Sequence, residues 1–83
     1  MPLFMDVHHN VDGLTADMAR LAHHKDLEVQ EKYAVRYLRY WFDEGASKVF
    51  CLVEAPSREA ATAVHREAHG LVADEIFEVK EGA

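Results

Sequence analysis

Four short apolar stretches and two longer segments with helical spacing alternate along the chain. The stretches at residues 3–9, 35–43, 49–53 and 75–79 are bounded by turn residues, which is typical of β-strands. The segments at residues 16–32 and 57–69 repeat their apolar positions every three or four residues, which is typical of helices. We therefore expect the order strand, helix, strand, strand, helix, strand.

The predicted helices have clear start and stop signals. Thr15 and Ser57 each offer a side-chain oxygen that can cap a helix, and Gly70 is a good terminator for the second helix. This order of elements is the split βαββαβ pattern of the ferredoxin-like α+β sandwich. We expect one such domain over residues 3–79, with an antiparallel sheet and two helices on one face.

Such a sandwich leaves the other face of its sheet uncovered. The predicted strands carry large apolar side chains toward both faces, among them Phe4 and Trp41. An uncovered face with such residues usually meets a partner. We expect a homodimer through the open sheet face, and a monomer with a half-solvated sheet is the alternative.

Composition narrows the class of protein further. The chain has 83 residues and a formal net charge of −6, which argues against generic nucleic-acid binding. It contains no apolar run near the length of a membrane span, and its first residues lack the pattern of a signal peptide. A single cysteine, Cys51, cannot form an intramolecular disulfide. We expect a cytoplasmic protein with no nucleic-acid or membrane partner.

Histidine is the residue type that points to chemistry. Six of the 83 residues are histidines, which indicates metal or proton chemistry. His65 and His69 are four residues apart, so both rings can approach one ion from one helix face. The predicted topology brings them to the end of the domain where His8 and His9 lie. We expect a metal site of His65, His69 and His9, and a solvated helix edge is the alternative.

The first strand offers a second pair of ligands. Asp6 and His8 are two residues apart and therefore share one face, whereas His9 points to the other. We expect Asp6 and His8 on the open face beside Phe4, either as a chelating pair or as a hydrogen-bonded pair without metal. We also expect Arg39 to form an ion pair with Asp6.

His23 and Asp26 are further candidate metal ligands, and Cys51 is another possible one. Their role depends on which side chains face the interior of the domain. In one rotation of the first helix, His23 and Asp26 form a buried pair; in the other, a stripe through Leu21 faces inward and His23 faces water. Periodicity leaves both rotations open. Cys51 lies in the middle of a predicted strand, where it is either a small buried apolar residue or a thiolate ligand.

Several segments together resemble a known family. The chain is similar to the small bacterial proteins of domain of unknown function 4242 in the segments Phe4-Met5-Asp6-Val7-His8-His9, Ala22-His23-His24-Lys25-Asp26-Leu27, Tyr37-Leu38-Arg39-Tyr40-Trp41 and Lys48-Val49-Phe50-Cys51-Leu52-Val53-Glu54-Ala55-Pro56. The resemblance implies a ferredoxin-like dimer and a role in nickel binding, with no established catalytic activity. Ni²⁺ accepts imidazole together with carboxylate and water.

The leading hypothesis is therefore a metal-binding protein that sequesters or handles nickel or a similar divalent ion. Its affinity should fall as the pH drops through roughly 6.5, because imidazole binds metal in its neutral form. A small enzyme is the second hypothesis, with His23, Asp26, Asp6 and Tyr40 as acid–base candidates in a cavity. A metal-free interaction module is the third. Catalysis is the less favoured reading, and whether the protein is an enzyme stays open.

Overall fold

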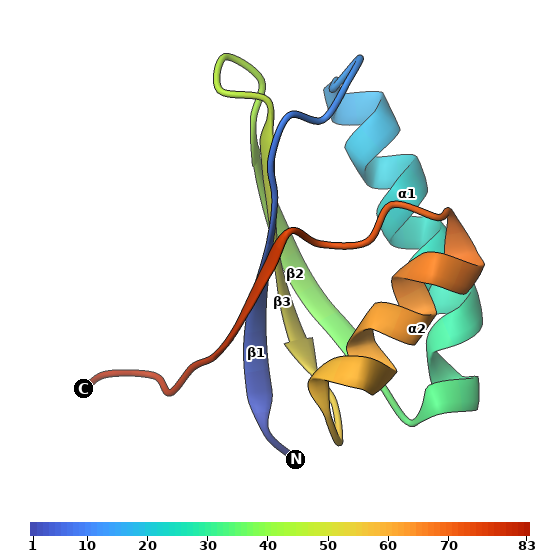
Figure 1. Cartoon of the computed structure of the whole chain (residues 1–83), viewed down its shortest axis with the longest axis vertical. Coiled ribbons are helices and arrows are strands. Elements are labelled where there is room, and N and C mark those ends of the chain that lie inside the picture. Colours follow the sequence, from blue (N-terminus) through green and yellow to red (C-terminus); the bar gives the residue numbers. More distant parts are fainter.

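The computed structural model describes all 83 residues as one sheet covered on one side by two helices (Figure 1). The elements are β1 (Leu3–His8), α1 (Ala16–Val29), the 3₁₀ helix η1 (Gln30–Tyr33), β2 (Arg36–Asp43), β3 (Lys48–Glu54), α2 (Arg58–Ala68) and β4 (Glu75–Glu78). The four strands are antiparallel in the order β2-β3-β1-β4. This arrangement confirms the predicted ferredoxin-like α+β sandwich.

Both helices begin where the capping residues predict. The Thr15 hydroxyl accepts a hydrogen bond from the backbone N–H of Met18, and the Ser57 hydroxyl accepts one from Ala60, each at 3.1 Å. The first helix was expected over residues 16–32, but α1 ends at Val29 and the chain then forms the 3₁₀ helix η1. Ala34 then adopts a left-handed conformation with φ of 57°, which turns the chain into β2.

The apolar core lies between the sheet and the helices. It consists of Phe4, Val35, Tyr37, Cys51, Val53, Ala55, Ala61 and Val64. The small side chain of Ala61 allows α2 to lie close to the sheet, since Ala61 is fully buried and its carbonyl accepts a hydrogen bond from Tyr37 of β2 at 2.9 Å. His65 follows Ala61 by one helical turn, so the same close approach places a histidine ring against the sheet.

The register of β1 reverses the predicted orientation of its side chains. Phe4 pairs with Val53 and Asp6 pairs with Cys51, so Phe4, Asp6 and His8 face the helices. The prediction that Asp6 and His8 lie on the open face is therefore wrong. Phe4 completes the core, and the two polar residues are tolerated inside because they meet polar side chains there.

A β-bulge in β2 also changes which residues share a face. The register passes from Tyr37 opposite Val53 to Arg39 opposite Leu52, which leaves Leu38 as an extra residue. Tyr37 therefore faces the helices while Arg39 is exposed on the open face. The predicted ion pair between Arg39 and Asp6 is wrong, because the two side chains lie on opposite sides of the sheet.

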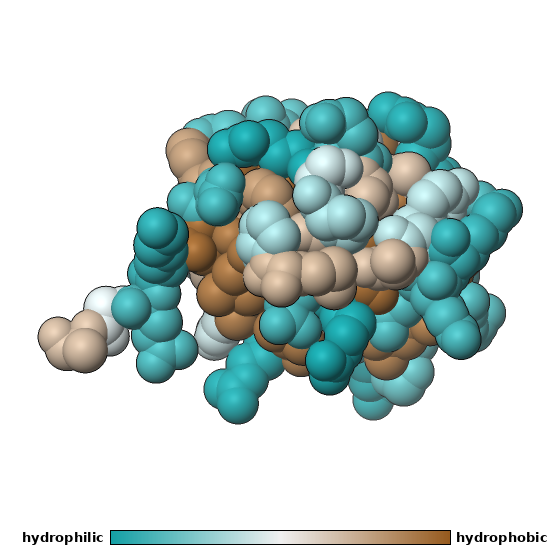
Figure 2. All heavy atoms as spheres, turned by 90° about the horizontal axis from the view of Figure 1, so that it is seen from below, coloured by the Kyte–Doolittle hydropathy of each residue, from teal (hydrophilic) through white to brown (hydrophobic).

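The face of the sheet without helices is strongly apolar. The strand registers place on it Leu3, Met5, Val7, Trp41, Phe50, Leu52 and Phe77. Trp41 and Phe77 are each 48% exposed. Seen along the layers in Figure 2, apolar side chains reach the surface between polar ones. No helix combines the length and the apolarity that crossing a bilayer requires.

Candidate metal centre

His65 lies at the centre of a buried polar cluster between the two layers. Its side chain projects from α2 and the residue is 1% exposed. Its Nδ1–H donates to the Asp26 carboxylate of α1, and its Nε2–H donates to the Asp6 carboxylate of β1, both at 2.9 Å. Three elements thus hold one imidazole ring between two carboxylates.

The Asp6 side of this ring is completed by β1, β2 and β3. His8 Nε2 lies 3.3 Å from Asp6 Oδ1, and the His8 ring meets the His65 ring edge to face, with centroids 4.9 Å apart. Cys51 is buried directly opposite Asp6 in the sheet register. The Tyr37 hydroxyl lies 2.9 Å from the Ala61 carbonyl and 3.2 Å from Asp6 Oδ2. Asp6 and His8 are therefore adjacent, as predicted, but they lie in the interior on the helix side of the sheet and not on its open face.

The Asp26 side is completed by His69, just after the end of α2. His69 Nε2 lies 3.1 Å from Asp26 Oδ1, and the His65 and His69 rings have centroids 5.0 Å apart. His69 Nδ1 accepts a hydrogen bond from the backbone N–H of Leu71 at 3.1 Å. The four-residue spacing thus brings both rings to one carboxylate, as that spacing predicts.

Three members of the cluster, Asp6, His65 and Cys51, have strongly shifted pKa values. Burial alone raises the pKa of Asp6, but the hydrogen bond from His65 and the nearby His8 hold it well below its usual range. Burial alone lowers the pKa of His65, but its bonds to Asp26 and Asp6 raise it to about 9. Burial and the neighbouring Asp6 carboxylate raise the pKa of the Cys51 thiol. At neutral pH the protein alone therefore holds an imidazolium between two carboxylates, beside a neutral thiol.

The donor atoms form two groups that share His65. Within each group the ligand atoms lie within 4.8 Å of one another: Asp6, His8, Cys51 and His65 in the first, and Asp26, His65 and His69 in the second. Two buried atoms, Asp6 Oδ1 and His69 Nε2, have close neighbours but no aligned hydrogen bond. A buried polar atom without a hydrogen bond lowers the stability of the folded protein unless another group binds it. Imidazole, carboxylate and thiol are ligands for a divalent transition metal, so the residues present fit one.

A small cavity leads from the surface to this cluster. Its volume is about 40 Å³, and its walls are formed by His8, Val11, Leu14, Met18, Ala19, Ala22, His23, Asp26, Tyr40, Val49, Cys51, His65, His69 and Leu71. The His23 ring lies against Tyr40, with centroids 4.8 Å apart, and burial lowers the pKa of His23. Three of the predicted acid–base candidates, His23, Asp26 and Tyr40, thus line one cavity, whereas Asp6 lies behind it.

α1 is rotated so that Asp26 faces the sheet. Ala19 and Asp26 are buried, His23 is half-buried and Leu21 is exposed. This settles the alternative that periodicity left open, since the stripe through Ala19, His23 and Asp26 faces inward. His23 and Asp26 share the cavity, but Asp26 directs its hydrogen bond to His65.

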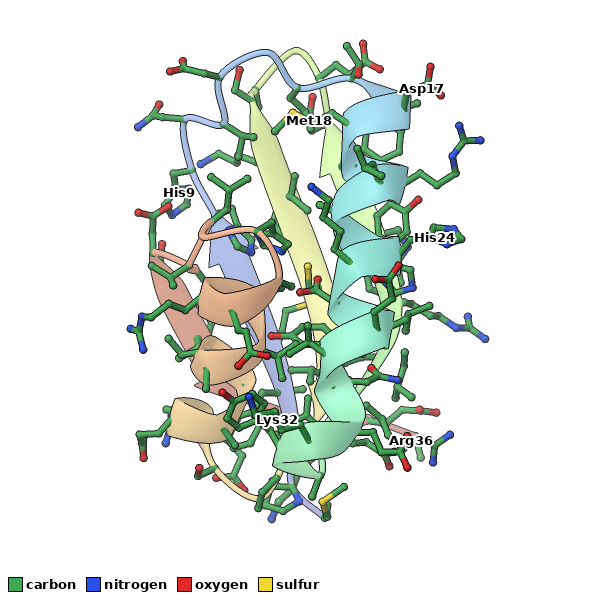
Figure 3. The ribbon with its side chains drawn as sticks, turned by 90° about the vertical axis from the view of Figure 1, so that its right-hand side faces the viewer. His9, Asp17, Met18, His24, Lys32 and Arg36 are labelled. Carbon is green, nitrogen blue, oxygen red and sulfur yellow. The ribbon has the colours of Figure 1, made fainter.

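His9 lies apart from the cluster. Its ring donates from Nε2 to Glu75 and accepts at Nδ1 from Lys48, and its backbone N–H donates to Asp74. Figure 3 shows His9 at the edge of the domain beside β4, whereas His24 projects outward from α1. The predicted grouping of His9 with His65 and His69 is wrong. Neighbouring strand residues point to opposite faces, and His8 occupies the inner one.

A buried cluster of imidazoles, carboxylates and a thiol in a ferredoxin-like domain defines a small protein with a potential metal-binding centre. The chain belongs to the family of SCO4226-like nickel-responsive proteins, whose profile matches residues 4–79. It is similar to the crystal structure of SCO4226 from Streptomyces coelicolor A3(2), with 42% sequence identity and a TM-score of 0.91, covering 98% of this chain and 99% of that chain. No curated protein matches the chain.

Proposed function

We propose that this protein binds nickel at the cluster around His65 and thereby sequesters or handles the ion. The observation that carries the proposal is the convergence of Asp6, Asp26, His8, His69 and Cys51 on one buried ring, with two ligand atoms left without a hydrogen bond. A family described as nickel-responsive supports nickel among the divalent ions. The finer resemblance to domain of unknown function 4242 stays a prediction.

The chemistry of the donors supports the same ion. Nickel accepts imidazole nitrogen together with carboxylate oxygen, and thiolate ligands add affinity for soft metals. A bound cation favours the deprotonated forms of its ligands, which offsets the raised pKa of Cys51 and of His65. Protons and nickel therefore compete for His65, so that affinity for the metal falls as the pH decreases. This competition reaches above pH 6.5 because the pKa of His65 is raised.

Calorimetric titration of the metal-free protein with Ni²⁺ tests the proposal. We expect saturable binding in the natural chain and a loss of affinity greater than about tenfold in His69→Ala, which removes a ligand at the cavity wall. His24→Ala is the matched control, since this histidine is exposed on α1 outside the cluster. Equal affinity in all three proteins would place the nickel elsewhere. No binding to the natural chain would exclude the proposed function.

One observation favours a second function, a small enzyme with acid–base residues in a cavity. His23, Asp26 and Tyr40 line the cavity of about 40 Å³, which has room for a few water molecules or a ligand of similar size. Burial keeps the pKa of His23 low, so its ring is neutral at physiological pH and is able to accept a proton. Soaking crystals with small polar molecules distinguishes the two functions, because the enzyme hypothesis requires a ligand in the cavity without metal.

We further propose that two copies associate through the open sheet face, in the cytoplasm. The apolar side chains of that face, including the half-exposed Trp41 and Phe77, support association by burying their surface. A reducing compartment suits the free thiol of Cys51. Light scattering after gel filtration should give the mass of a dimer for the natural chain and of a monomer for Trp41→Glu. A monomeric natural chain would refute the dimer.

A further inference from the structure

The cavity between α1 and the sheet changes in character along its depth. Its outer wall includes six half-buried or exposed apolar residues, namely Val11, Leu14, Met18, Ala22, Val49 and Leu71. Its inner wall contains the buried side chains of Asp26 and His65. A cavity of this kind suits an organic ligand with a short apolar chain and one polar head.

The polar end of the cavity has an excess of negative charge. The carboxylates of Asp6 and Asp26 hold one imidazolium, that of His65, between them. Two negative charges and one positive charge leave one negative charge without a counter-charge. His69 adds none, because its Nδ1 accepts a hydrogen bond from Leu71 and its ring is therefore neutral. An unbalanced charge is costly in the interior, so a ligand with a single positive charge is favoured there.

We propose that the cavity binds a short protonated primary amine, with its ammonium group between Asp26 and His23 and its alkyl chain along the outer wall. An ammonium group has three N–H donors. Asp26 offers one acceptor, because its contacts with His65 and His69 both use Oδ1 and leave Oδ2. His23 offers a second acceptor on the cavity wall, since burial lowers the pKa of its ring and keeps one nitrogen unprotonated.

The ring of Tyr40 strengthens the attraction for an organic cation. It lies against the His23 ring, with centroids 4.8 Å apart, and both residues line the cavity. An aromatic face attracts a positive charge, and the attraction grows where water is excluded. The whole chain has a formal net charge of −6, so its field also draws cations rather than anions to the surface.

The size of the cavity restricts the ligand to a small primary amine. Its volume of about 40 Å³ is roughly three times the space that one water molecule needs. An ammonium group with about two carbon atoms has a similar number of heavy atoms. A quaternary ammonium ion is bulkier and has no N–H to donate to Asp26, and an anion would be repelled by the carboxylates of Asp6 and Asp26.

This inference goes beyond the proposed nickel-binding function and concerns the protein without metal. His23 belongs to neither group of closely spaced ligand atoms around His65. A change at His23 therefore affects the binding of an amine while the donor atoms for nickel stay in place. The two proposals can be tested separately on the same variant.

Titration of the metal-free protein with ethylamine at neutral pH, followed by NMR of side-chain methyl groups, tests the proposal. Ethanol is the neutral probe of matched size, and KCl at equal ionic strength is the inorganic cation. We expect shifts of the methyl signals of Leu14, Met18 and Val49 that saturate at millimolar ethylamine. We expect no such shifts with ethanol or with KCl.

Two variants test the two ends of the ligand. His23→Phe keeps an aromatic ring against Tyr40 but removes the accepting nitrogen, so it should weaken ethylamine binding about tenfold or more. His24→Phe is the matched control, because His24 is exposed on the same helix. Ala22→Leu narrows the outer wall without touching a polar group and should also weaken binding. Circular dichroism checks that each variant is folded.

The possible outcomes separate this proposal from its alternatives. No saturation by about 50 mM ethylamine overturns it. Equal shifts with ethanol overturn the recognition of charge, and equal shifts with KCl overturn the choice of an organic cation. Unchanged affinity in both His23→Phe and Ala22→Leu overturns the placement in the cavity. A natural chain that binds ethylamine but not Ni²⁺ supports this proposal and refutes the proposed nickel-binding function.

Discussion

Raising the pH from neutral toward 9 should destabilise the metal-free protein through His65. Burial alone lowers the pKa of this histidine, but its bonds to Asp26 and Asp6 raise it from 6.5 to about 9 in the folded state. A group whose pKa is raised by folding binds more protons in the folded chain than in the unfolded chain. Its contribution to stability is therefore complete below pH 6.5 and is lost as the pH rises through about 9.

The size of this effect follows from the two pKa values. Linkage with values of 6.5 and about 9 gives a loss of roughly 2 kcal/mol in the free energy of unfolding between about pH 6.5 and 8.5. Other groups act mainly outside this window. The lowered pKa values of Asp6 and Asp26 matter in acid, and the lowered pKa of His23 acts with the opposite sign, at lower pH. The raised pKa of Cys51 adds a further loss near pH 9.

Urea unfolding in the presence of a chelator, followed by circular dichroism across this window, measures the loss. Asp26→Asn removes one of the two carboxylates that hold the imidazolium, so its stability should depend less steeply on pH. Asp17→Asn is the matched control on the same helix, because Asp17 pairs only with Arg20 at the surface. A natural chain whose free energy of unfolding is constant or rises from pH 6.5 to 8.5 would refute the claim that Asp6 and Asp26 hold His65 in its protonated form. An unchanged slope in Asp26→Asn would refute it as well.

Three further predictions concern stability at one pH and are measured by the same urea titration. Tyr37→Phe should lower the free energy of unfolding by about 1 kcal/mol, because it removes the buried hydrogen bond from the Tyr37 hydroxyl to the Ala61 carbonyl; no change would mean that this bond contributes nothing. Thr15→Ala should cost about 1 kcal/mol by removing the cap of α1. Ala34→Gly should instead stabilise the protein by roughly 1 kcal/mol, since Ala34 has a left-handed backbone that glycine adopts without strain; a loss of stability would contradict this reasoning.

The order of elements and the helix starts follow from local signals. Thr15 and Ser57 cap the helices they precede, and the strand stretches are recognised from their composition and flanking turns. Such signals lie within a few residues of one another, so a single sequence contains them in full. The ferredoxin-like arrangement then follows from the order of the elements.

The orientation of β1 could not be predicted in the same way. Leu3, Met5 and Val7 make one face of the strand more apolar than the face with Asp6 and His8, yet the latter is inside. The reason is His65, which is 59 residues from Asp6 along the chain and supplies its hydrogen bond. Burial of a polar residue depends on its tertiary partners, and no local pattern reveals them.

The centre itself was predicted in part. The fold places five of the predicted ligands in one connected cluster, whereas the sequence predicts separate sites. The five are Asp6, His8, Asp26, His65 and His69. His9 belongs elsewhere because its strand position follows that of His8. The bulge at Leu38, which decides the faces of β2, has no turn residue to mark it.

The contact between Leu71 and His69 makes the loop after α2 sensitive to the state of one nitrogen. Because Nδ1 of His69 accepts the Leu71 N–H, a neutral ring carries its proton on Nε2. If a metal ion bound Nε2, the ring proton would reside on Nδ1, and Nδ1 could no longer accept the Leu71 N–H. Leu71, on the cavity wall, would then lose this hydrogen bond, whereas Asp74 at the far end of the loop would keep its backbone bond to Val7 of β1. Loading of the proposed centre would thereby change the hydrogen bonding of an exposed stretch of backbone.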